Sequence, residues 1–316
     1  MQSGSETATL QSETTSRRDE LSERRPRGFT FPHPVLAYYA LTFAISWGGV
    51  LMVVGGPGGI PATSDQIARL MPLAIVFMLF GPSIAGVLMT ALVDGKKGLH
   101  ELLSHLLMWR VGALWYAVAL LTAPVVYTVV LGLLSLSSPA FLPGIIVTHD
   151  KLPFLLVGTA PGLLVGFLEE LGWTGFAIPR LRLRYGVVIT GLIAGVVWGA
   201  WHLLTNDLWA AAIVKGEIPL GVYVMLTAFG LLIGQLPAFR LLMVWMYDRT
   251  GSLLLAMLMH ASLVFSTFVL GPVGLTGVSG LVYGYAIGGA MWLVVALVAT
   301  RKGAQFSRIA LRTRVV

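Results

Sequence analysis

Two adjacent carboxylates, Glu169 and Glu170, lie inside a long apolar run that begins near Leu152. The chain has 14 acidic residues, and the others fall in a polar tail or in short polar connections. A carboxylate at membrane depth is expensive, so it usually faces a polar interior and has a function there. The pair therefore favours acid–base chemistry or an ion site over a purely structural hydrogen-bond network.

Two histidines lie in equally apolar surroundings. Of the six histidines in the chain, only His202 and His260 fall within the expected membrane spans. One such histidine is often a structural hydrogen-bonding residue, but two of them with a carboxylate pair match a catalytic or ion site better. The chain has no cysteine, which excludes a disulfide framework, a thiolate metal site and a cysteine nucleophile.

The composition identifies the setting of these residues. Of the 316 residues, 56% are hydrophobic and 11% are charged, whereas soluble domains carry about 25% charged residues. The apolar runs are roughly 18 to 27 residues long, enough for a helix to cross a bilayer. We therefore predict an all-α, polytopic helical membrane protein. Basic loops beside the membrane explain the net charge of +7, so no nucleic-acid partner is expected.

Eight spanning segments are expected. Residues 1–34 form a polar tail without the apolar core of a signal peptide, and we predict that this tail is disordered and cytoplasmic. A helical membrane domain is predicted over residues 35–300, and a basic cytoplasmic tail over residues 301–316. The spans are predicted at 35–54, 71–92, 113–136, 154–177, 187–204, 220–246, 252–270 and 281–299.

Two segments have further features. Pro237 lies within the long sixth span and predicts a kink or a strong tilt there. The connection 98–109 has leucines at helical spacing, which predicts an amphipathic helix on the membrane surface. His100 and His105 lie near its polar side, where we expect both to be simply solvated.

The basic residues predict the orientation of the spans. If the N-terminus is cytoplasmic, 18 of the 21 lysines and arginines, Arg240 among them, fall on the inside. The other three, Arg69, Lys151 and Lys215, fall on the outside. This asymmetry follows the positive-inside rule. It predicts a multi-pass protein of the cell membrane with both termini in the cytoplasm.

Helical spacing determines which residues share a face with the glutamates. Glu170 is ten residues from the inner edge of its span, roughly 15 Å along a helix and near the middle of a ~30 Å bilayer core. Successive positions point about 100° apart, so the two glutamates cannot face one spot equally. Glu169 shares a stripe with Gly162 and Gly166, whereas Glu170 shares one with Gly166 and Thr174.

Glycines at helical spacing predict close helix packing in two spans. Gly162 and Gly166 form a GxxxG motif in the fourth span, a pattern typical of tightly packed membrane helices. The glutamates on this helix are therefore expected to meet a neighbouring helix rather than lipid. Gly191, Gly195 and Gly199 form a second smooth face in the fifth span.

The depth of the candidate residues presents a conflict. His202 lies one turn beyond the second glycine face, near the outer end of the fifth span, whereas Glu169 and His260 are expected near mid-depth. Straight helices would leave His202 apart from the others. A tilt, or a break of the fourth span near Pro161, would bring the residues level.

Three motifs follow one another along the second half of the chain. Glu169–Leu181 reads EELGWTGFAIPRL, Trp198–His202 reads WGAWH, and His260–Ser262 reads HAS. In this order they resemble the CPBP family of intramembrane proteases, which includes the type II CAAX prenyl endopeptidases and the bacterial Abi-type bacteriocin-immunity proteins. The resemblance covers about residues 155–270. It implies cleavage of a peptide bond in or near the membrane.

The sequence departs from the family pattern at two positions. Thr174 stands where the resemblance implies an arginine, and Val264 stands where it implies an asparagine. The first change removes a cation that would orient a carboxylate or bind substrate, and the second removes an amide that would polarise a carbonyl or hold a water. A hydroxyl from Thr174 or Thr267 is a weak substitute.

The resemblance also implies roles for the candidate residues. Glu169 would be the base that activates water, while Glu170, His202 and His260 would hold the water, a metal or the oxyanion. Glu169, His202 and His260 would bind zinc if a metal is present, but a metal-free glutamate mechanism is equally compatible with this set. The expected partners are membrane lipid and a membrane-embedded or lipidated peptide, of the CAAX type or another. The oligomeric state is not predicted.

Two other functions compete with proteolysis. A non-catalytic membrane scaffold or bacteriocin-immunity protein is favoured by Thr174 and Val264. An ion-coupled transporter is also considered, because buried glutamates and histidines form proton relays. It ranks last, because the sequence lacks the clear internal repeat that many transporters show.

Overall fold

The structure is a computed structural model that describes residues 32–306. All regular elements in this range are helical, and eight helices are long and apolar enough to cross a membrane. The prediction of an all-α, polytopic membrane protein with eight spans is therefore confirmed. Most of the two predicted tails, at residues 1–31 and 307–316, lies outside the described residues.

The first seven helices run from the N-terminal side through α6, which carries the glutamates, to α8. They are α2 (Pro34–Val54), α3 (Ser64–Leu106), α4 (Ala113–Ser135), α5 (Gly144–Val147), α6 (Lys151–Gly172), α7 (Ile178–Arg182) and α8 (Val187–His202). The remaining helices are α9 (Ala211–Val214), α10 (Leu220–Ile233), α11 (Gln235–Thr250), α12 (Leu253–Phe265) and α13 (Gly277–Phe306).

Local sequence signals account for several helix ends. Pro34 occupies the first turn of α2, where its missing N–H has no helical partner to lose. Thr63 and Gln66 form a reciprocal capping box at the start of α3. The Ser252 hydroxyl accepts a hydrogen bond from the Leu255 N–H at 3.2 Å and caps α12. Between these ends, helices satisfy their own backbone hydrogen bonds, as lipid requires.

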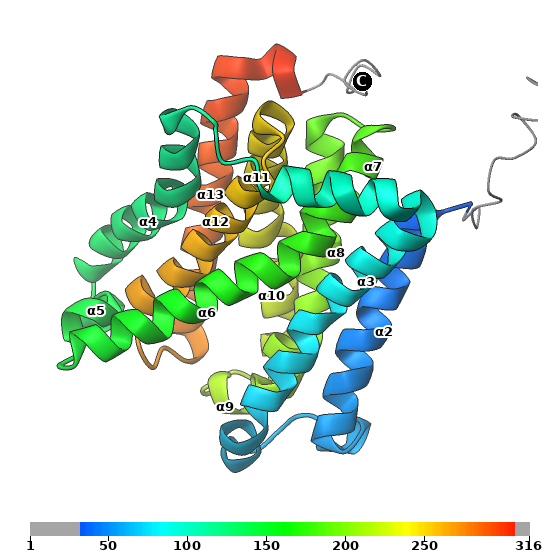
Figure 1. Ribbon diagram of the computed structural model, residues 1–316. Helices are drawn as coiled ribbons and strands as arrows, with labels where there is room; N and C mark the ends of the chain where they lie inside the picture. Colours follow the sequence, from blue (N-terminus) through cyan, green and yellow to red (C-terminus); the bar gives the residue numbers. More distant parts are fainter. Residues whose placement is uncertain (1–31, 307–316) are drawn as a thin grey trace, which may run out of the picture.

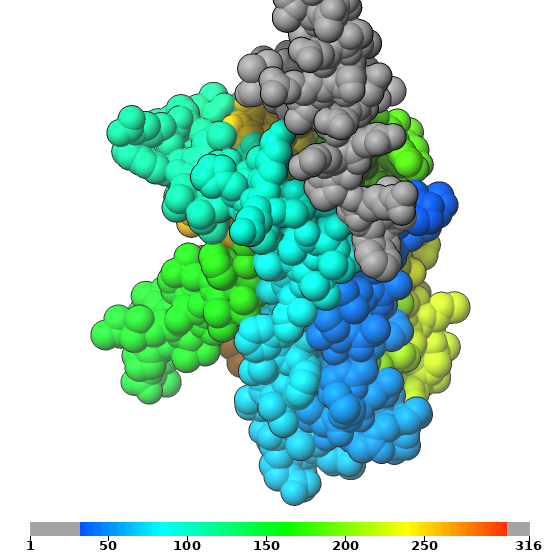
Figure 2. Space-filling model, turned by 45° about the vertical axis from the view of Figure 1, so that its right-hand side comes forward, coloured from blue at the N-terminus to red at the C-terminus, as the bar shows by residue number. Residues whose placement is uncertain are grey.

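The long helices form one bundle around α6 and α8 (Figure 1). α6 crosses the bundle obliquely and lies against α12 and α3. α8 packs against α11 and α10. α2 and α3 run side by side along one face, as the blue and cyan surfaces of Figure 2 show. The carboxylates of α6 are thereby enclosed by helices that come from both halves of the chain.

The predicted kink in the sixth span is present, whereas the break considered near Pro161 is absent. A proline ring clashes with the carbonyl four residues earlier, so the break falls just before Pro237. The sixth span is interrupted at Gly234 (φ −83°, ψ −119°), which separates α10 from α11, three residues before Pro237. Pro161 lies within an unbroken α6. Three π-helical segments extend the fourth, fifth and seventh spans: Trp173–Ala177, Leu203–Trp209 and Ser266–Leu270.

The predicted surface helix is the second leg of α3. The chain turns at Gly95, whose φ of 64° and ψ of −151° interrupt the helix and are readily accessible only to glycine. The second leg continues to Leu106 and runs across the end of the bundle (Figure 1). The expectation that His105 is simply solvated is wrong, because its Nδ1 lies 2.7 Å from the Gly251 carbonyl oxygen.

The structure corrects the assignment of one basic residue. Arg240 was counted with the basic residues at the inner ends of the spans, but its side chain is fully buried within α11. The remaining split is 17 to 3, since Arg240 leaves the inside set of 18. The orientation inferred from the charges is therefore unchanged, and one arginine becomes part of the interior.

Eight spans predict opposite locations for two reporter fusions. A fusion at residue 145 follows three spans, whereas a fusion at residue 310 follows all eight. The start of α2 and the end of α13 lie at the same end of the bundle (Figure 1). We expect an alkaline-phosphatase reporter to be active at 145 and inactive at 310, with the reverse for a fluorescent reporter that matures only in the cytoplasm. The same location for both fusions would contradict the topology.

Candidate active site

The GxxxG motif of α6 brings the glutamates close to α12. A Cβ atom on Gly162 would lie 3.0 Å from the Ala261 carbonyl oxygen, and one on Gly166 would lie 3.0 Å from the Ala261 nitrogen. These contacts are tighter than side chains normally make, so only glycine allows the two backbones to approach this far. The close approach positions Glu170 directly beside His260. The expectation that this glycine face meets another helix is confirmed.

This packing predicts a large difference between two glycine-to-alanine substitutions. Gly166→Ala introduces a methyl group against the α12 backbone, whereas a Cβ on Gly132 of α4 meets no atom within 4 Å. Overpacking typically costs about 1–3 kcal/mol, while alanine in an open helical position stabilises by about 0.5–1 kcal/mol. We expect thermal unfolding in detergent at a lower temperature for Gly166→Ala and at an equal or higher temperature for Gly132→Ala. Equal effects would refute the close contact.

The second glycine face positions α11. A Cβ on Gly191 would lie 2.7 Å from the Leu241 Cα, and one on Gly195 would lie 2.5 Å from the Pro237 Cα and 3.3 Å from the Arg240 Cβ. The interface between α8 and α11 therefore has no room for larger side chains on this stripe. Arg240 is held at the level of the glutamates as a result.

Glu170 is fully buried, and both of its carboxylate oxygens have hydrogen-bond partners. Its Oε1 and Oε2 accept hydrogen bonds from Nη1 of Arg240 at 2.9 and 2.7 Å. Oε1 also lies 2.7 Å from Nδ1 of His260, and Oε2 accepts a hydrogen bond from the Thr174 hydroxyl. An anion with this many charge-assisted partners is stabilised in its ionised form. Glu170 therefore serves to hold other groups in place.

Glu169 has a different environment on the neighbouring face of α6. Its side chain is buried, and its Oε2 accepts a hydrogen bond from the Trp198 indole N–H at 2.9 Å. Among the described residues, this indole is the one hydrogen-bond donor to the Glu169 carboxylate. Nε2 of His260 lies 4.0 Å from the same oxygen. Glu169 thus keeps unused acceptor capacity next to a histidine nitrogen.

His202 joins this cluster through Trp198. Its Nδ1 lies 2.9 Å from the Trp198 carbonyl oxygen one turn earlier in α8, which leaves Nε2 as the ring nitrogen available to other groups. The His202 and Trp198 rings meet edge to face at 5.6 Å, and Trp198 meets His260 in the same way at 5.0 Å. The structure therefore brings the predicted residues together, with Trp198 between the two histidines.

Each helix that carries one of the four predicted site residues continues into a π-helical segment. The segment Trp173–Ala177 follows the glutamates, Leu203–Trp209 directly follows His202, and Ser266–Leu270 begins six residues after His260. π-helical turns are rare and occur frequently at functional sites, because they re-aim the side chains around them. The sequence gives no clear sign of these turns.

The two departures from the family pattern have different outcomes. Thr174 reaches Glu170 with its hydroxyl, as expected for a weak substitute, and the cation beside Glu170 comes from Arg240 on α11. Thr267 does not take the corresponding part near His260. Its hydroxyl lies 2.8 Å from the Tyr127 hydroxyl instead. Arg240 and Trp198 are the residues of the cluster that the sequence analysis did not assign to it.

The donor set does not form a metal site as it stands. In the part of the chain that the structure describes, no group of three or more His, Asp or Glu side chains is placed to hold a metal ion. Of the predicted zinc ligands, His202 and His260 each direct Nδ1 at an acceptor within the protein, and Nε2 of His260 lies 4.0 Å from Oε2 of Glu169. The mechanism proposed below therefore uses no step through a metal, and zinc binding stays a prediction.

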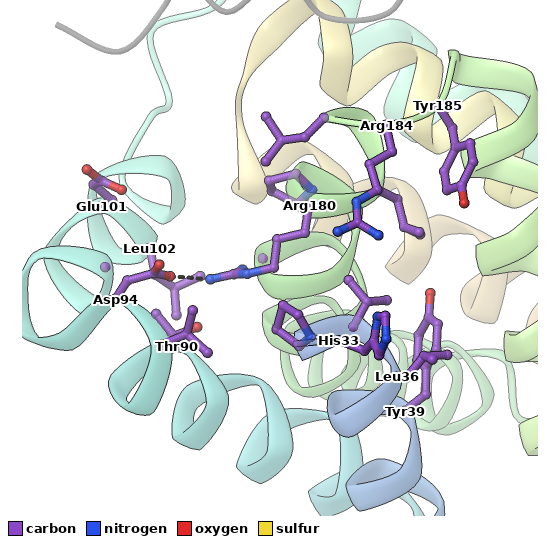
Figure 3. A pocket seen from close by; sticks show the side chains of 18 of the residues that line it. His33, Leu36, Tyr39, Thr90, Asp94, Glu101, Leu102, Arg180, Arg184 and Tyr185 are labelled. Carbon is purple, nitrogen blue, oxygen red and sulfur yellow. Dashed lines mark hydrogen bonds and ion pairs between the residues drawn. The ribbon is translucent and has the colours of Figure 1, made fainter. Parts of the chain in front are cut away.

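A cavity of about 870 Å³ lies at one end of the bundle, between α2, α3 and α7. Its polar lining includes Asp94, Arg180 and Arg184, and an ion pair joins Arg180 to Asp94 (Figure 3). Gly175, in the π-helical segment that follows the glutamates, forms part of the wall. None of the four predicted site residues lines this cavity. It is a neighbour of the Glu–His cluster and not the cluster itself.

Two comparisons with known proteins agree with the motifs. Residues 151–266 match the family model described as type II CAAX prenyl endopeptidase Rce1-like. A CAAX prenyl protease 2 of Methanococcus maripaludis is 34% identical over 68 residues, which are 22% of this chain and 24% of that protein. The chain thus aligns with about a quarter of the length of this relative. The resemblance to the CPBP/CAAX proteases is confirmed, and it is concentrated in the segment that begins with α6 and ends one residue after α12.

Proposed function

We propose that the protein, whose residues 151–266 match the model of the type II CAAX prenyl endopeptidase family, is an intramembrane endopeptidase in which Glu169 activates water. One observation carries the proposal. Of the two adjacent glutamates, Glu170 has both oxygens bound by Arg240, whereas within residues 32–306 the only donor to Glu169 is the Trp198 indole. Glu169 therefore retains the acceptor capacity that a general base needs.

The separation of two polar atoms supports a bridging water. A water that hydrogen-bonds at ~2.8 Å to two atoms 4.0 Å apart, here Glu169 Oε2 and His260 Nε2, makes an angle of roughly 90° between them. That angle is close to the angle between the two O–H bonds of a water molecule, so one water can donate to both atoms. Glu169 would take one proton of this water as its oxygen attacks the scissile carbonyl carbon. Glu169 would then return the proton to the leaving amine.

The two histidines would assist this attack in different ways. Glu170 holds His260 through Nδ1 at 2.7 Å, which fixes the direction of Nε2 toward the water. His202 presents Nε2, because its Nδ1 is directed at the Trp198 carbonyl. Because Nδ1 then carries the proton of the neutral ring, Nε2 would accept a hydrogen bond from the attacking water or from the substrate amide and so help to position it.

A membrane-embedded or lipidated peptide is the proposed substrate class. The Glu–His cluster is buried among helices that carry extensive exposed apolar side chains toward the lipid, so a substrate reaches it most directly from the membrane. The 17 to 3 charge asymmetry supports a location in the cell membrane with both termini cytoplasmic. The relative described as a CAAX prenyl protease makes prenylated peptides the first substrates to try.

The proposal is tested by incubating the purified protein with a panel of prenylated and transmembrane peptides and identifying the products by mass spectrometry. The expected result is cleavage of at least one peptide. Parallel reactions with a chelator, and with zinc added back, test the metal: activity that survives chelation favours the metal-free mechanism, and activity restored by zinc favours the metal. A folded protein that cleaves no peptide would favour the scaffold or immunity function.

A further inference from the structure

Arg240 is the buried cation of the candidate site. Its side chain is 0% exposed, as is that of its partner Glu170. Removing two charges from water is costly, and such a pair contributes little net stability compared with apolar residues of similar size. A buried pair of this kind needs a reason other than stability. The contacts of Arg240 provide one.

The first chain of contacts runs through Glu170 to His260. Nη1 of Arg240 donates to both oxygens of Glu170, and Oε1 of Glu170 lies 2.7 Å from Nδ1 of His260. The charge of Arg240 keeps Glu170 an anion, and the anion fixes the rotation and tautomer of the imidazole ring. The orientation of Nε2 toward Glu169 therefore depends on Arg240.

The second chain of contacts runs through Trp198 to Glu169. The guanidinium carbon of Arg240 lies 4.2 Å from the centre of the Trp198 ring, a cation–π distance. The indole N–H of the same tryptophan donates to Glu169 at 2.9 Å. Arg240 thus supports both members of the proposed Glu169–His260 pair without touching either carboxylate oxygen of Glu169.

Position 174 approaches Glu170 from its own helix. Thr174 is four residues after Glu170, and its hydroxyl donates to Oε2. Residues four apart on a helix are neighbours, so an arginine at 174 would also reach this carboxylate. A single nitrogen of Arg240, Nη1, makes both contacts to Glu170. The site therefore uses one positive charge and not the full guanidinium fork.

From these contacts we propose that Arg240 is a positioning residue for the Glu169–His260 pair, and that its cation can be supplied from position 174 instead. This inference rests on the proposed peptidase function, because it assigns a role within that site. It predicts that activity follows the presence of one cation beside Glu170, whichever helix carries it.

Four variants test this proposal with a peptide that the wild type cleaves. Arg240→Met removes the cation, and Arg240→Lys keeps the charge with one nitrogen. Thr174→Arg combined with Arg240→Met moves the charge to the π-helical segment that follows Glu170. Arg182→Met is the matched control, because Arg182 is also a buried arginine and its Nε donates to Asp248 at 2.8 Å.

We expect kcat to fall at least 100-fold in Arg240→Met and to stay within tenfold of wild type in Arg240→Lys. In the double variant, kcat should recover at least tenfold relative to Arg240→Met. Arg182→Met is expected to stay within threefold of wild type per folded molecule.

A second readout keeps this proposal separate from the proposed function. In protein labelled with ¹⁵N-histidine, the His260 signals are expected to shift in Arg240→Met, to return toward wild type in the double variant and to be unchanged in Arg182→Met. This comparison holds even if the wild type cleaves no peptide, an outcome that would reject only the peptidase. Where Arg240→Met does not fold, Arg240→Lys and the double variant decide. Three results would overturn the proposal. The first is full activity in Arg240→Met, and the second is an equal loss in Arg240→Met and Arg182→Met. The third is a folded double variant that recovers neither activity nor the wild-type His260 signals.

Discussion

Glu169→Gln is expected to lower the turnover number about 10²–10⁴-fold, the range for removal of a general base. Glutamine keeps the size of the side chain, and its amide oxygen can still accept the Trp198 indole hydrogen bond seen at 2.9 Å. It cannot take a proton from water. Because a neutral amide is cheaper to bury than a carboxylate, the folded protein should be as abundant and as stable as the wild type.

Glu170→Gln is the matched comparison for this variant. It neutralises the other glutamate of the pair and leaves Arg240 without an anionic partner, so we expect a clear loss of thermal stability together with lost activity. The measurement is the initial cleavage rate per folded molecule, with unfolding followed in the same detergent. Full activity in Glu169→Gln would exclude Glu169 as the base and make Glu170 the candidate.

Two substitutions of His260 are expected to lower the turnover number by about 10²-fold or more, within the range for acid–base groups. Asparagine reproduces the position of Nδ1, which lies 2.7 Å from Glu170, but it has nothing at Nε2. Glutamine reaches the Nε2 position near Glu169 but loses the hydrogen bond to Glu170. Since the account needs both nitrogens, neither variant should retain substantial activity.

The control for these variants is His105→Asn. His105 also uses Nδ1, which lies 2.7 Å from the Gly251 carbonyl oxygen, but it lies at the end of the bundle. We expect its initial cleavage rate to stay within about threefold of wild type, as for a residue outside the reacting groups. Unchanged turnover in His260→Asn would show that Nε2 takes no part in the reaction.

Periodicity predicted the helix contacts that build the site. The spacing of Gly162 and Gly166 predicted a close neighbour, and that neighbour is α12 with His260. The types and rarity of the buried glutamates and histidines predicted that they belong together. The partner helices themselves did not follow from the sequence, because a smooth glycine face does not specify which helix packs against it.

Charge counting explains why Arg240 was missed. The positive-inside rule treats every basic residue as a loop residue, although Arg240 fell within the predicted span 220–246. An arginine inside a span, in a chain with two buried carboxylates, was the signal that could have identified the ion pair. The role of Trp198 had a weaker signal, since an aromatic residue one turn before His202 is also an ordinary core residue.

The depth conflict at His202 has a structural explanation that the sequence does not contain. The fifth span does not end at 204 but continues through a π-helical segment to Trp209, so His202 lies farther from the end of its helix than predicted. The fourth span likewise continues to Arg182. π-helical turns depend on a local change of hydrogen-bond register, which leaves no clear periodic pattern among apolar residues.

The most direct test of the central claim is the mass of the products that purified wild-type protein and Glu169→Gln form from one membrane peptide in liposomes. The account predicts two fragments from the wild type whose masses sum to that of the substrate plus one water. It predicts at most about 1% of that rate from Glu169→Gln. Equal rates of fragment formation by the two proteins would contradict the role of Glu169. If folded wild-type protein leaves every peptide of the panel intact, that result would contradict the peptidase function itself.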